Sequence, residues 1–182
     1  WNPVTSDYST IPYHRIYDLF GGFGASRDGN TALIGSFEYA TSALDIVNLQ
    51  TGEQITKKGF SDYIGDIVHS WDETRFLIGS YGNSYIGGGY IYVFDRASNK
   101  VKGYYKQFGA RRLTVSPRYV FTTSTYVDYY GDGTTTQGSI YQRGVEVLHL
   151  NAKSELAFQR SYFLCFPHDY GMRVRLLYAE EK

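Results

Sequence analysis

The side chains best suited to chemistry are a few histidines and aspartates. His69 and His168 each lie at or near the end of a short apolar run, and two histidines brought together can bind a metal ion or polarise a substrate. No metal-ligand spacing joins them, and a histidine in an ordinary hydrogen bond is the commoner arrangement. We therefore keep His69 and His168 as speculative ligand-binding residues and expect no metal site.

Asp18, Asp62 and Asp66 form a second candidate set, because they precede or begin similar apolar runs. Converging carboxylates can act as an acid and a base. The alternative is that Asp18 and Asp62 accept hydrogen bonds from backbone N–H groups in matched turns. Their repetition favours the turn role, so we assign no catalytic residue.

Tyrosines form the third candidate set. Tyr85 lies in one glycine-rich stretch, while Tyr126, Tyr129 and Tyr130 lie in another, and both stretches are expected to be long loops. Tyrosines on adjacent loops can form a contact surface for a protein or a glycan. Packing of the two loops against each other is the competing interpretation. The second stretch also holds Asp128 and Asp132, but its spacing does not match a calcium-binding loop.

These residues are distributed over an internal repeat. The segment from Asp18 aligns without gaps on the segment from Asp62, and both contain an apolar strand, a Ser-x-Asp turn and a second apolar strand. The turns are Ser26-Arg-Asp28 and Ser70-Trp-Asp72, and a weaker copy begins at Leu113. Third and fourth strands follow in each copy.

A period of about 45 residues with four strands per unit is typical of a β-propeller blade. We therefore predict an all-β fold, a partial or small β-propeller with about three full four-stranded blades and a partial fourth. The blades are expected at residues 18–61, 62–109, 110–161 and 162–182. Residues 1–17 are expected to form an extended lead-in or a closing strand.

Composition limits the classes of partner. Basic and acidic residues number 18 each, so no overall charge points to nucleic acid. No apolar run is long enough to span a membrane. The single cysteine, Cys165, lies in an apolar run, where a buried and unreactive thiol is expected.

Residues 68–116 resemble the YVTN-type repeats of quinoprotein and amine-dehydrogenase-like propellers. The resemblance rests on the turn at Ser70, the strand Phe76–Ser80, the glycines 87–89, the strand Ile91–Asp95 and the turn Ala97–Lys100. It implies a propeller fold. It brings no set of cofactor ligands to this chain, and we expect no cofactor.

The function expected from these patterns is that of a non-enzymatic propeller, a structural or recognition module in a surface or multi-chain assembly, with a protein or glycan ligand. The alternative is an enzyme or enzyme subunit with a site in the propeller channel. Because such repeats usually build six to eight blades, we also expect a second copy, or the rest of a longer propeller chain, to complete the ring. Otherwise the chain closes on itself with four blades.

Overall fold

The computed structural model describes residues 10, 13, 19–38, 41–60, 63–81, 89–106, 112–129 and 139–164. Within these ranges the chain forms twelve strands and no helix. The first sheet contains β1 (Leu19–Ala25), β2 (Thr31–Glu38), β3 (Thr41–Asn48) and β4 (Gln54–Phe60). The second contains β5 (Tyr63–His69), β6 (Arg75–Tyr81), β7 (Tyr90–Asp95) and β8 (Lys100–Lys106). The third contains β9 (Leu113–Val115), β10 (Tyr119–Tyr129), β11 (Ser139–Leu150) and β12 (Leu156–Leu164).

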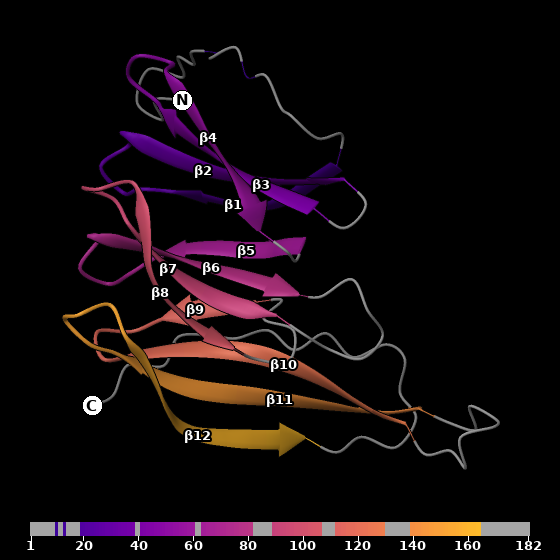
Figure 1. Cartoon of the computed structure of the whole chain (residues 1–182). Helices are drawn as coiled ribbons and strands as arrows, with labels where there is room; N and C mark the ends of the chain where they lie inside the picture. The colour runs from indigo at the N-terminus through magenta and orange to yellow at the C-terminus, as the bar shows by residue number, and fades with distance from the viewer. Residues whose placement is uncertain are drawn as a thin grey trace.

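Each sheet is an antiparallel meander in which neighbours in sequence are neighbours in space. Figure 1 shows the three sheets one above the other in chain order. The predicted all-β class and the four-stranded repeat unit are therefore confirmed. No helix in the described ranges has the length and hydrophobicity needed to cross a membrane.

The repeated Ser-x-Asp turns have the same hydrogen bonds in the first and second sheets. The Ser70 hydroxyl donates to Asp72 Oδ1 at 2.6 Å and accepts from the Arg75 N–H at 3.1 Å, and Ser26 bonds to Asp28 and Thr31 in the same way. The residue after the aspartate has a positive φ in both turns, 69° at Gly29 and 58° at Glu73. Each turn thus uses its serine and aspartate to satisfy backbone donors.

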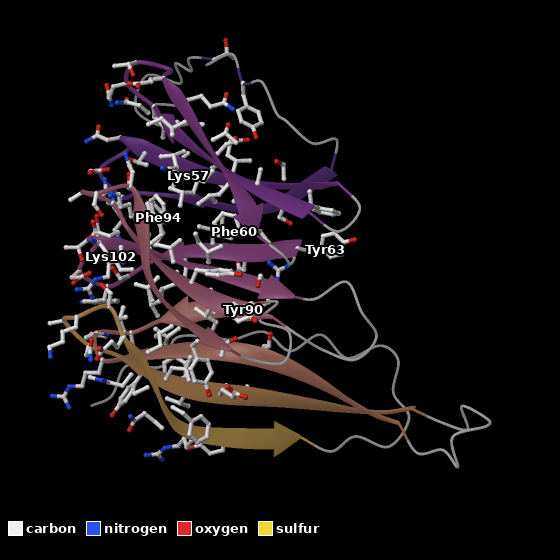
Figure 2. All side chains as sticks on the ribbon, in the orientation of Figure 1. Lys57, Phe60, Tyr63, Tyr90, Phe94 and Lys102 are labelled. Carbon is white, nitrogen blue, oxygen red and sulfur yellow. The ribbon has the colours of Figure 1, made fainter. Side chains whose placement is uncertain are left out.

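Two apolar cores lie between the sheets. The first joins the first and second sheets through Leu33, Leu44, Ile46, Phe60, Ile64, Ile67, Phe76, Ile78 and Phe94. The second joins the second and third sheets through Leu77, Ile91, Val93, Leu113, Val120 and Leu148. Phe60 and Phe94 can be followed in Figure 2. Because both faces of the second sheet are covered, its strands are apolar on both sides.

The inner strands β1 and β5 approach very closely. A Cβ added at Gly21 would lie 2.3 Å from the Ile64 carbonyl oxygen, and one at Gly24 would lie 2.7 Å from the Ile67 side chain. The glycines of β1 are therefore required by the distance between two backbones.

The structure corrects one expectation and extends another. Residues 125–129 and 139–143, expected to lie in a long loop, continue β10 and β11 as a paired ladder in which Tyr126 is opposite Gln142 and Tyr129 is opposite Ser139. Backbone pairing satisfies the amides there, and alternating β-branched and aromatic residues favour it. β12 continues to Leu164, three residues beyond the expected end of the third unit. The rest of the expected fourth unit lies outside the described residues.

The N-terminal segment is described only at Thr10 and Tyr13. The Tyr13 hydroxyl donates to Asp45 Oδ2, and the Thr56 hydroxyl donates to Asp45 Oδ1 at 2.6 Å. Asp45 is fully buried on the face of the first sheet that points away from the second. Tyr13 therefore packs on the first sheet.

Candidate functional site

Of the two candidate histidines, the structure describes only His69. His69 ends β5, is half-buried, and has its Nδ1 atom 3.1 Å from the Ser70 carbonyl oxygen. His168 lies outside the described residues. Among the described residues, no group of three or more histidine, cysteine or acidic side chains is placed to hold a metal ion.

Asp66 links two sheets. Its Oδ2 accepts a hydrogen bond from the Leu113 N–H of β9 at 2.8 Å, and its Oδ1 accepts one from the Ile67 N–H at 3.1 Å. Burial raises the pKa of Asp66, and the two backbone donors and the Arg112 charge oppose that rise. Its carboxylate is thus engaged by the inner strand of the next sheet. Asp18 and Asp62 lie outside the described residues.

The tyrosine set is only partly placed. Tyr126 and Tyr129 belong to β10, where the structure describes their backbone pairing, and not to a loop. Tyr85 and Tyr130 lie outside the described residues. A contact surface formed by these tyrosines therefore stays a prediction.

A polar cluster that the sequence did not reveal joins the turns of the first and second sheets. Arg96 donates to Asp28 Oδ2 at 2.8 Å and to the Glu73 carbonyl oxygen at 2.9 Å, and its guanidinium lies 5.9 Å from the centre of the Phe76 ring. Arg27 lies 3.4 Å from the Glu73 carboxylate and 5.4 Å from the Trp71 ring centre. Hydrogen bonds from Ser26 and Arg96 lower the pKa of Asp28 well below its usual range. Two guanidinium groups thus face two carboxylates.

At the corresponding boundary between the second and third sheets, no such cluster of arginines and carboxylates is found among the described residues. A hollow of about 90 Å³ lies there, with both polar and apolar walls. It is lined by Ser70, Trp71, Asp72, Arg75, Leu77, Val115, Ser116, Pro117, Arg118, Tyr119, Val120 and Leu150. Arg75 donates to the carbonyl oxygens of Asn151 at 3.2 Å and Ala152 at 2.9 Å, and so ties the two sheets together beside the hollow.

Asp72 is the acidic group of this hollow. Burial opposes its ionisation, but hydrogen bonds from the Ser70 and Thr74 side chains outweigh that effect and lower its pKa. Its Oδ2 lies 4.0 Å from Arg75. The hollow is a candidate binding site in the described part of the chain.

A half-buried glutamate at the same boundary is expected to make stability depend on pH. Glu146 of β11 has a buried Oε2 atom with no hydrogen-bond partner among the described residues, and burial raises its pKa. The folded state therefore holds this proton more tightly than the unfolded chain does. The contribution of protonated Glu146 to the free energy of unfolding is fully present below the pKa that this group has in the unfolded chain. It is lost as the pH rises through the higher pKa that the group has in the folded protein.

We expect Glu146→Gln to be more stable than the parent at pH 7, and to lose less stability between about pH 4.5 and 7, because glutamine carries no charge to desolvate. Urea denaturation at several pH values measures this. Glu53→Gln, at an exposed position, controls for loss of one negative charge. Equal pH profiles for the parent and Glu146→Gln would contradict the assignment.

Comparison with known proteins shows likeness in fold alone. No family model and no curated protein sequence matches the chain. The solved structure of Kuenenia stuttgartiensis hydrazine synthase matches with a TM-score of 0.59 and 16% identity, over 75% of this chain and 41% of that chain. The tricorn protease matches with a TM-score of 0.50 and 14% identity, over 72% of this chain and 14% of that chain.

Both of these proteins contain β-propeller domains, so the fold of this chain is propeller-like. The chain spans less than half the length of either structure that it matches.

Proposed function

We propose that this chain is a non-enzymatic propeller module that works by association, as part of a structural or recognition assembly. Its partner is a second copy of the chain or the remaining part of a longer propeller, and the completed assembly presents a surface to a protein or glycan ligand. The proposal is supported by the two end faces of the stack.

The observation that carries it is the exposure of Phe23. Phe23 of β1 is opposite Ile34, as Ile67 of β5 is opposite Ile78 in the second sheet. Ile67 is 3% exposed and Ile78 is fully buried, because the first sheet covers them, whereas Phe23 is 62% exposed. Burying a side chain of this size contributes about 1.5–3 kcal/mol. Tyr13 bonds to Asp45 on this same face but leaves Phe23 exposed, and a preceding sheet would supply that burial.

The other end of the stack has a matching apolar face. Phe121 of β10 is opposite Val147, as Leu33 is opposite Ile46 and Leu77 is opposite Val93. Leu33 and Leu77 are fully buried by the following sheet, whereas Phe121 is half-buried. A face of this kind is complementary to the face that carries Phe23, which favours association from end to end.

The alternative, a propeller enzyme with a channel site, would use His69, His168 or the aspartates near the inner strands. Within the described residues, Asp66 accepts backbone hydrogen bonds and His69 lies against a backbone carbonyl group. These contacts support structural roles for both residues.

Light scattering on the purified chain tests the proposal. We expect particles larger than the 20.7 kDa monomer, or a protein that is soluble only with a second chain, and we expect Phe23→Ser to reduce association. Trp71→Ser is the matched control, because Trp71 is 43% exposed and lies at a turn instead of an end face. A monomer at all concentrations would reject the proposal.

A further inference from the structure

The hollow between the second and third sheets has a filled counterpart one repeat earlier. Arg75 is opposite Asp95 in the second sheet, and Tyr119 is opposite His149 in the third, so Leu150 occupies the place of Arg96. Val120 likewise takes the place of Phe76. At the first boundary, Arg96 lies over Phe76 and reaches Asp28. At the second, both side chains are smaller, and a hollow of about 90 Å³ remains.

The turn between β9 and β10, beside the hollow, is also shorter than the matching turn between β5 and β6. The Ser70 N–H donates to the Arg75 carbonyl oxygen, five residues on, whereas the Ser116 N–H donates to the Tyr119 carbonyl oxygen, three residues on. The two missing residues remove the position of Glu73, whose carboxylate faces Arg27 at the first boundary. The third sheet therefore lacks the acidic group that the second sheet supplies.

The charges at the two boundaries differ accordingly. Arg27 and Arg96 are balanced by Asp28 and Glu73 at the first boundary. The hollow at the second is lined by two arginines, Arg75 and Arg118, and one carboxylate, that of Asp72. Within the described part of the chain no acidic group lies within 4 Å of the exposed Arg118 guanidinium. The lining of the hollow therefore holds one more arginine than carboxylate.

We propose that this hollow binds a carboxylate that carries a short apolar body, so that the ligand supplies the acidic group missing from the shortened turn. Val115, Pro117 and Leu150, which line the hollow and keep accessible surface, offer apolar contacts to the body of the ligand, and Arg118 pairs with its carboxylate. The volume equals that of about three water molecules, which suits one small aliphatic group. The proposal does not depend on the association proposed above.

Such a carboxylate can come from a free aliphatic acid or from the C-terminus of a peptide. Isovalerate represents the first source, and acetyl-Gly-Gly-Val with a free C-terminus represents the second. Isovaleramide, which has the same shape as isovalerate and no charge, is the control ligand. The chain contains two tryptophans, and Trp71 lines the hollow, so its indole N–H signal in a nitrogen-15 NMR spectrum reports binding.

We expect isovalerate or the peptide to shift the Trp71 indole signal in a saturable way, and isovaleramide to leave it unchanged. Arg118→Gln should weaken binding about tenfold, because a charge-assisted hydrogen bond is lost. Arg160→Gln, at an exposed position on β12, should leave affinity unchanged. Tighter binding of one probe identifies the source of the carboxylate. Equal shifts with isovaleramide, equal affinity in Arg118→Gln, or no shift up to about 50 mM of either acid would overturn the proposal.

Discussion

Replacing Gly21 by alanine is expected to destabilise the fold by about 3 kcal/mol, the upper end of the usual cost of overpacking, although it adds a single methyl group. The added Cβ would lie 2.3 Å from the Ile64 carbonyl oxygen, which belongs to the backbone of the neighbouring inner strand. A backbone atom cannot rotate away as the end of a side chain can, so β1 and β5 must separate. The apolar core between the first and second sheets then loses its close packing.

Urea denaturation followed by tryptophan fluorescence measures this loss. Gly29→Ala is the matched control, because it adds the same methyl group at a turn where nothing lies within 4 Å. Gly29 has a φ of 69°, so alanine there carries only a backbone cost of about 1–2 kcal/mol. A Gly21→Ala variant as stable as Gly29→Ala would show that the two inner strands do not approach so closely.

Phe76→Ala is expected to cost about 3–5 kcal/mol, the second large effect. Phe76 is fully buried in the core between the first and second sheets, and its removal leaves a cavity there. The Arg96 guanidinium, 5.9 Å from the Phe76 ring centre, also loses an aromatic partner. The same change therefore weakens both the apolar core and the polar cluster above it.

Phe158→Ala is the control for this change, since Phe158 on β12 is 51% exposed and its truncation should cost about 1 kcal/mol or less. Both variants replace a phenylalanine by an alanine, so the difference between their losses of stability reports the effect of burial at Phe76. Similar losses in both variants would contradict the placement of Phe76 in the core.

The repeat unit could be predicted from the sequence because its signals are local. A Ser-x-Asp turn forms from hydrogen bonds between residues at most five apart, as at Ser26 and Ser70. The strand Ile91–Asp95, quoted for the resemblance, lies within β7, and turn residues flank that apolar run. The resemblance to propeller repeats used these same turn and core positions.

The long ladder of β10 and β11 could not be predicted in the same way. Its two arms contain strand-forming tyrosines and β-branched residues, but Gly131, Gly133 and Gly138 lie between them in the sequence and favour a loop. Pairing between Tyr126 and Gln142 depends on two segments separated by this glycine-rich stretch. The composition of each arm alone does not contain that information.

The polar contacts between sheets were missed for a related reason. Arg96 follows Asp28 by 68 residues, and an arginine in a turn is ordinarily an exposed charge. Only the arrangement of the first and second sheets brings the two side chains together. The hollow at the next boundary becomes apparent only when Leu150 is compared with Arg96 in the same structural position.

The all-β class, the four-stranded unit and its turns follow from the amino-acid sequence, because each depends on residues close together in the chain. The packing of the sheets shows which faces are buried, why β1 is rich in glycine, and where charges meet across a boundary. The physical reason is distance: contacts such as Gly21 with Ile64, or Asp66 with Leu113, join residues more than forty positions apart. Such contacts exist only after the sheets have packed.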